Sequence, residues 1–393
     1  MHVARGFELT YCTNIHAAEG WPQVFSSVRR YAPELKRRLS SGSPFGVGLR
    51  LANSESIELL QGGRLDEFAD FLRSAGLYVA LINGYPFGHF HGRPLKDQVF
   101  APDWLRTDRV DYTLRLIEIL TRLVPAGMEG GISTCPLSYK PWFKGSAPAD
   151  EHVMIRNVVH VVQALVEASR RSGALIHLDI EPEPDGWIET TAEFVQFFKQ
   201  LLRQGVPQLV SVAQLSASEA EQALRDHVAM CYDACHLAVE REEPGETIQS
   251  LQREGIRIGR VQISSALKVK IPESAADRER LRERLSGFSD AVYLHQIVGD
   301  RERFADLPEG LAQLPHACGS EWRIHYHVPL FLESYGALGS TQDDVRAALA
   351  AVAPSTVRHL EIETYTWGVL PAGLKADLVD SIEREYRWVL DQL

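Results

Sequence analysis

Eight short apolar runs recur along the chain, and most are followed by the periodicity of an amphipathic helix. The runs begin near residues 8, 46, 78, 129, 175, 228, 258 and 358. Gly76, Gly173, Gly205 and Gly255 stand where the helical patterns are expected to end. A doubly wound sheet also uses alternating units, but here no glycine-rich phosphate-binding turn follows the first run. The sequence therefore predicts an α/β protein closed into a (β/α)₈ TIM barrel.

The last interval between runs is about twice as long as the others, at roughly 100 residues. We therefore expect one barrel domain over residues 1–393, with residues 265–339 inserted between the seventh and eighth strands. The insertion contains a charged stretch at 277–284 and strand-like runs at 291–298 and 322–330. Because barrels of this kind carry their chemistry at the C-terminal ends of the strands, we expect the insertion to cover that mouth as a lid.

Composition and charge exclude several classes of protein. With 45% hydrophobic and 24% charged residues, the chain can bury a large core. A formal net charge of −11 disfavours nucleic acid as a partner. No apolar run is long enough to span a membrane, and the residues after Met1 lack the pattern of a secretion signal, which predicts a cytoplasmic location. The five cysteines show no paired spacing and are expected to be buried thiols.

Polar residues alternate with apolar ones on four successive strands. If the apolar residues face the helices, the polar ones face the barrel axis. This inward set is His177, Asp179, Glu181, Asp233, Gln262, Ser264, Glu361 and Glu363. Glu181, Asp233, Gln262 and Glu363 together predict a site for one divalent metal ion, because carboxylate and amide oxygens suit Mn²⁺ or Mg²⁺ better than Zn²⁺. Two alternatives stay open: core ion pairs with Arg50 or Arg323, or a register shift that turns these residues outward.

Further residues are expected at the substrate-binding side. His236 follows Asp233 by three residues, and Arg323, His325 and His327 share one face of the run at 322–330. These four residues are candidates to contact an anionic or polyhydroxy substrate, as are His91, near His89 after the third strand, and Lys140 after the fourth. For the paired histidines a structural hydrogen bond is the alternative, and for His236 and Lys140 a solvated surface position.

The residues that point inward also carry a resemblance. The order Glu181, Asp233-Ala-Cys-His236, Gln262 and Glu363 is similar to the xylose-isomerase-like sugar phosphate isomerase/epimerase superfamily. Asn83-Gly-Tyr-Pro-Phe-Gly, Arg323-Ile-His-Tyr-His-Val-Pro and Glu361-Ile-Glu-Thr-Tyr-Thr-Trp resemble the EboE family of metabolite traffic proteins, encoded in Ebo clusters. The resemblance implies that Glu181, Asp233 and Glu363 are metal ligands and that His236 contacts substrate. Many superfamily members have histidine where this chain has Gln262, whereas hydroxypyruvate-isomerase-like members have glutamine there.

The expected function is a metal-dependent sugar isomerase or epimerase that moves a proton on a small polyhydroxy carbonyl compound through an enediolate. Glu181 and Glu363 would be the catalytic proton-transfer pair. A non-catalytic metabolite carrier is the alternative from another class, with other Ebo-cluster proteins as partners. A metal-dependent phosphodiester hydrolase is a further alternative, disfavoured by Gln262 and by the negative charge.

Overall fold

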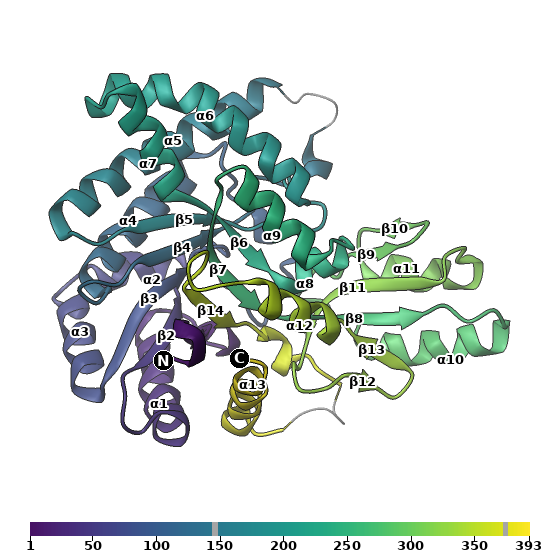
Figure 1. Cartoon of the computed structure of the whole chain (residues 1–393). Helices are drawn as coiled ribbons and strands as arrows, with labels where there is room; N and C mark the ends of the chain where they lie inside the picture. Colours follow the sequence, from purple (N-terminus) through teal and green to yellow (C-terminus); the bar gives the residue numbers. More distant parts are fainter. Residues whose placement is uncertain (144–147, 372–375) are drawn as a thin grey trace.

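The computed structural model describes residues 1–143, 148–371 and 376–393. Eight parallel strands form one sheet in the order β1-β14-β7-β6-β5-β4-β3-β2. An isolated parallel bridge between Cys12 and Gly48 joins the two edge strands, so the sheet forms a nearly closed barrel (Figure 1). Its strands are β1 (Glu8–Tyr11), β2 (Phe45–Arg50), β3 (Leu77–Asn83), β4 (Gly130–Thr134), β5 (Ile176–Ile180), β6 (Val228–Asp233), β7 (Arg257–Ile263) and β14 (His359–Ile362).

Every barrel strand begins within one residue of the start expected from the sequence, and the predicted (β/α)₈ barrel is confirmed. The helices that connect the strands surround the sheet (Figure 1). They are α1 (Trp21–Leu39), α2 (Asn53–Leu59), α3 (Arg64–Ala75), α4 (Thr107–Leu123), α5 (Pro148–Ser172), α6 (Thr191–Ala213), α7 (Ala217–His227), α8 (Ala234–Val239), α9 (Pro244–Arg253), α12 (Gln342–Ala351) and α13 (Leu378–Gln392).

Gly205 does not end a helix, contrary to the sequence prediction, because α6 continues through it to Ala213. The glycine instead lets α6 pack closely on its neighbours. A Cβ atom at this position would lie 2.9 Å from Val159 on α5 and 3.1 Å from Leu224 on α7. By contrast, Gly76 has a φ of +64° directly after α3, as the end of that helix requires.

Between β7 and β14 the chain builds a second, six-stranded sheet in the order β10-β9-β11-β8-β13-β12. Its strands are β8 (Ser265–Lys270), β9 (Ile297–Gly299), β10 (Arg303–Phe304), β11 (Glu321–Val328), β12 (Ser334–Tyr335) and β13 (Leu338–Ser340), with α10 (Ala275–Ser286) and α11 (Leu307–Gln313) between them. In Figure 1 this sheet extends to one side of the barrel. The charged stretch 277–284 lies in α10, and the run 322–330 corresponds to β11.

The other strand-like run, 291–298, is mostly not a strand, because only its end belongs to β9. Lys96, from the connection after β3, holds this segment in a bent conformation. Its Nζ donates hydrogen bonds to the carbonyl oxygens of Asp290 at 3.1 Å and Tyr293 at 2.7 Å, and to Asp306 Oδ2 at 2.6 Å. A tertiary contact thus overrides the local strand propensity.

Four of the five cysteines are buried free thiols as expected, whereas Cys318 is exposed. Among the described residues, no helix has the length and apolar character that crossing a bilayer requires.

Candidate metal centre

Two of the inward carboxylates, Asp179 and Glu361, form ion pairs in the barrel core. Arg260 on β7 lies 2.9 Å from Asp179 Oδ2 and 3.0 Å from Glu361 Oε2, and all three side chains are fully buried. His177 also bonds Asp179. A Cβ atom at Gly259 would lie 1.9 Å from Asp179 Oδ1, so glycine makes room for this cluster. The ion-pair alternative therefore holds for Asp179 and Glu361, although the partner is Arg260 rather than Arg50 or Arg323.

Three other carboxylates meet at the C-terminal ends of β5, β6 and β14. Glu181, Asp233 and Glu363 each place an oxygen so that the three atoms lie within 4.8 Å of one another, and all three residues are buried. Asp233 caps α8: its Oδ1 accepts from His236 N at 2.9 Å and from Ser264 Oγ at 2.8 Å. Asp233 Oδ2 and Glu181 Oε2 have no hydrogen-bond partner within the described chain.

Electrostatics make this group unstable without a compensating charge. Burial raises the pKa of Glu181 well above its usual range, and the charge of Asp233 adds to the effect. Burial and the charges of Glu181 and Asp233 likewise raise the pKa of Glu363. For Asp233 burial acts in the same direction, but the neighbouring imidazoles of His236 and His327 and the hydrogen bonds to Oδ1 lower its pKa. Oxygen atoms at these separations, two without a partner, fit a divalent cation.

Gln262 lies beside this group, in register with Asp233 on β6 and Glu361 on β14. Its Oε1 accepts a hydrogen bond from Cys231 Sγ at 3.2 Å, and its Nε2 is buried without a partner among the described residues. The amide oxygen that the sequence assigned to the metal is therefore already engaged by a weak donor.

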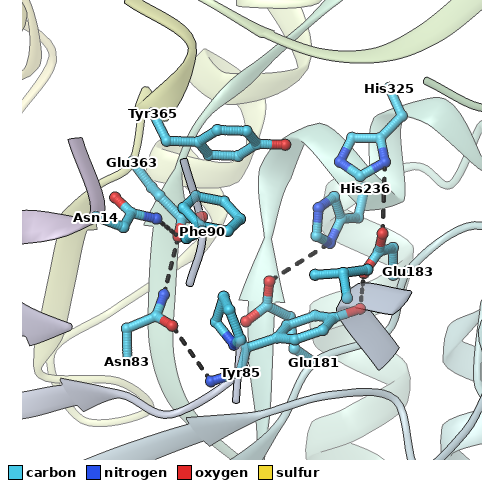
Figure 2. Close-up of a pocket in the computed structure, with 12 residues that line it drawn as sticks. Asn14, Asn83, Tyr85, Phe90, Glu181, Glu183, His236, His325, Glu363 and Tyr365 are labelled. Carbon is cyan, nitrogen blue, oxygen red and sulfur yellow. Dashed lines mark hydrogen bonds and ion pairs between the residues drawn. The ribbon is translucent and has the colours of Figure 1, made fainter. Parts of the chain in front are cut away.

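A small pocket of about 50 Å³ opens above the carboxylates (Figure 2). It is lined by Asn14, Asn83, Tyr85, Pro86, Phe90, Val99, Glu181, Glu183, His236, His325, Glu363 and Tyr365. Phe90, Tyr293 and Tyr365 form an aromatic roof at this place, with ring centroids 5.0–5.1 Å apart. These rings come from the connection after β3, from the inserted segment and from η6 (Tyr365–Gly368). Phe90 and Tyr365 line the pocket, and Tyr293 packs against both of them.

The predicted substrate-binding residues divide into two groups. His236 and His325 line the pocket, and His327 lies beside them with ring centroids 5.5 Å from each. Arg323 instead donates to the carbonyl oxygen of Ala238 at 2.6 Å and lies 3.4 Å from Asp344. Lys140 bridges Glu189 and Glu193, both at 2.7 Å, in a different pocket.

His91 supports the roof rather than lining the pocket. Its Nε2 lies 2.5 Å from the carbonyl oxygen of Asn14, and its Nδ1 lies 2.7 Å from the hydroxyl of Tyr293. The ring therefore connects the barrel to the inserted segment, and burial lowers its pKa to about 4.

Several pocket residues were not predicted from the sequence. Asn14 Nδ2 and Asn83 Nδ2 both donate to Glu363 Oε1, at 2.7 and 3.0 Å (Figure 2). Tyr85 donates its hydroxyl to Glu183, whose pKa burial and the charge of Asp233 raise well above its usual range. The alternation that placed Glu181 inward also applies to Glu183, two residues later, so this residue had a detectable signal.

No protein-family model matches the chain, and no curated protein matches it either. Among solved structures, it is similar to the IolI protein with a bound zinc atom: 12% identity, TM-score 0.48, 98% of this chain and 97% of that one. The probable 3-DHS dehydratase AsbF from Bacillus anthracis gives 10% identity and a TM-score of 0.47 over 97% and 98% of the chains. A xylose isomerase domain protein from Alicyclobacillus acidocaldarius subsp. acidocaldarius gives 11% and 0.45 over 98% and 97%. At these values the functions of the neighbours do not transfer to this chain.

Proposed function

We propose that the protein is a metal-dependent isomerase or epimerase that acts on a small polyhydroxy carbonyl compound. The observation that carries the proposal is the meeting of Glu181, Asp233 and Glu363, with ligand atoms within 4.8 Å, at the base of a small pocket. A divalent cation held there, Mn²⁺ or Mg²⁺ by its oxygen ligands, would polarise a substrate carbonyl and stabilise the charge of an enediolate.

Within this proposal Glu181 and Glu363 transfer the proton. One carboxylate removes the proton from the carbon next to the carbonyl group, and the other group, present as the carboxylic acid, donates a proton. In epimerisation this proton reaches the same carbon from the opposite face. In isomerisation it reaches the former carbonyl carbon, and the hydroxyl proton moves to the former carbonyl oxygen. Asn14 and Asn83 hold Glu363 through Oε1 and so fix its orientation. His325, which lines the pocket with an Nε2 atom that lacks a partner in the described structure, is placed to bond a substrate hydroxyl group.

The aromatic roof supports chemistry that must exclude water. Phe90, Tyr293 and Tyr365 are each less than 10% exposed. An enediolate formed beneath them would be protected from uncontrolled protonation by solvent. Because one water molecule needs about 10–15 Å³, the pocket of about 50 Å³ is small for a sugar. Substrate entry is therefore proposed to displace the roof.

The test combines metal analysis with proton exchange. The purified protein, loaded with Mn²⁺, is incubated in D₂O with a panel of unphosphorylated and phosphorylated ketoses, aldoses and keto-cyclitols, and carbon-bound deuterium is followed by NMR. We expect about one bound ion at the carboxylates and deuterium incorporation next to the carbonyl group of at least one compound.

Other outcomes support the competing functions. Tight binding of a compound without exchange would favour a carrier, and cleavage of an added phosphodiester without exchange would favour a hydrolase. Failure to bind any divalent ion would remove the basis of the proposal. The resemblance to the EboE family makes other Ebo-cluster products the first partners to seek by co-purification. A cytoplasmic location is part of the same proposal.

A further inference from the structure

Three buried imidazoles gather beside Asp233, and two of them come from the inserted sheet. His325 and His327 lie on β11, and His236 lies on α8. The ring centroids of His236 and His325 are 4.5 Å apart, and each lies 5.5 Å from His327. All three residues are 4% exposed or less. Only His236 belongs to the motif that pointed to the metal site, so the pattern of the barrel strands does not account for this cluster.

In each of the three rings, Nδ1 lies within hydrogen-bond distance of an oxygen acceptor. His236 Nδ1 lies 3.0 Å from the carbonyl oxygen of Pro182, His327 Nδ1 lies 2.8 Å from that of Glu363, and His325 Nδ1 lies 2.7 Å from Gln296 Oε1. An oxygen acceptor at Nδ1 selects the neutral tautomer with its proton there, which leaves a lone pair on Nε2. Histidine ligands of metals are oriented in this way, by a hydrogen bond from the other ring nitrogen.

The Nε2 atoms of His236 and His327 both lie near Oδ2 of Asp233. Oδ2 lies 3.9 Å from His236 Nε2 and 4.0 Å from His327 Nε2, and all three residues can offer ligand atoms within 4.8 Å of one another. These separations are too long for hydrogen bonds. An ion about 2.0–2.2 Å from each atom would span them. Asp233 Oδ2 and His327 Nε2 are both buried and unpartnered in the described residues.

We propose that Asp233, His236 and His327 bind a second divalent cation next to the carboxylate position, with Asp233 shared between the two. Two imidazoles and one carboxylate suit Zn²⁺ or a similar late first-row ion rather than Mg²⁺. The inserted sheet would then supply a metal ligand. This inference deepens the proposed function, and the bridging role of Asp233 rests on that function. It assigns His236 and His327 to the second cation and His325 to the substrate.

The test counts bound ions. Chelator-treated protein is dialysed against Zn²⁺ and analysed for metal, and Co²⁺ titration reports each site by its visible absorption. We expect two equivalents in the wild type, one in His236→Asn and in His327→Asn, and none in Asp233→Asn. His227→Asn is the matched control, since His227 is 5% exposed and its Nδ1 lies 2.6 Å from the carbonyl oxygen of Ile176, outside the cluster. It should bind two equivalents, and so should Cys235→Ser, although Cys235 lies near His325 and His327.

The outcomes separate this inference from the proposed function. If His236→Asn and His327→Asn both keep the wild-type stoichiometry, the second site is refuted, whatever Glu181→Gln and Glu363→Gln do. If only the two histidine variants lose an ion and the glutamate variants lose none, the imidazole site stands and the carboxylate site fails. If a variant does not fold, the second site is tested instead on the wild-type protein, by NMR of ¹⁵N-labelled histidines. Zn²⁺ must shift the Nε2 signals of two histidines, and unchanged signals overturn the proposal.

Discussion

Two side-chain amides orient Glu363, one of the carboxylates of the proposed metal position. Asn14 and Asn83 both donate to one of its carboxylate oxygens. Glu363→Gln keeps the size of the side chain but cannot accept a carbon-bound proton. We expect deuterium exchange into substrate to fall by ~10² or more, with the helical circular dichroism unchanged.

The same loss is expected for Glu181→Gln, because both carboxylates are assigned to proton transfer. Glu246→Gln, an exposed position on α9, serves as the control and should keep wild-type exchange. Exchange is measured by NMR at saturating Mn²⁺, so that weaker metal binding does not imitate a loss of chemistry. Wild-type exchange in both Glu181→Gln and Glu363→Gln would contradict the assignment.

At the residue scale, sequence alternation located the carboxylates but not their partners. Alternation depends only on neighbours along one strand, so it could place Glu181, Asp233 and Glu363 at the barrel mouth. The bond from Asn14 to Glu363 joins residues 349 positions apart. Likewise, nothing local distinguishes Glu361, which pairs with Arg260, from Glu363 two residues later. Such contacts follow from the closure of the barrel and cannot be read from periodicity.

At the scale of elements, Glu385 on α13 connects the inserted sheet to the barrel. Its Oε1 accepts from Leu330 N, just after β11, at 3.2 Å and from Thr364 Oγ1, just after β14, at 2.7 Å. Burial raises its pKa from 4.5 to about 8, and the two hydrogen bonds only partly oppose this effect. The folded protein therefore keeps the proton between these pH values, whereas the unfolded chain releases it.

The sign of the pH dependence follows from these two states. Between pH 4.5 and about 8 the folded state binds more protons than the unfolded state, so Glu385 makes the free energy of unfolding decrease as pH rises. At about 1.4 kcal/mol per pKa unit, the decrease is at most ~5 kcal/mol. Glu385→Gln removes this dependence while it retains an acceptor for Leu330 and Thr364. We expect the melting temperature of Glu385→Gln, relative to wild type, to increase from pH 5 to pH 8, and a constant difference would contradict the prediction.

The predictability of the elements depends on how local their causes are. The barrel strands carry their own apolar periodicity, and their starts were found within one residue. The segment 291–298 has apolar residues for a different reason, because Tyr293 packs in the aromatic roof and Lys96 holds the surrounding backbone. The inserted sheet pairs β8 with β11 and β13 across long connections, and no turn signal in the sequence specified these pairs.

At the scale of the whole molecule, the barrel and the inserted sheet share one hydrophobic cluster. Leu9 and Leu178 from the barrel belong to it, together with Leu267, Trp322 and Ile324 from the inserted sheet. Polar contacts cross the same boundary, including the bond from Gln296 Nε2 to the carbonyl oxygen of Pro184 at 2.8 Å. Units that unfold separately are usually joined by few contacts. We therefore propose that the two sheets form a single cooperative unit.

This cooperativity can be tested together with metal binding, because a ligand that binds only the folded state stabilises every part that unfolds with it. We expect one thermal transition, with coincident midpoints from far-ultraviolet circular dichroism and from tryptophan fluorescence, to which Trp322 in the inserted sheet contributes alongside Trp21 and Trp104 in the barrel. A divalent ion at 100 times its dissociation constant should add about 2.7 kcal/mol and raise both midpoints equally. Asp233→Asn should abolish this increase. Two separate transitions, of which the metal shifts only one, would show that the inserted sheet folds independently of the barrel.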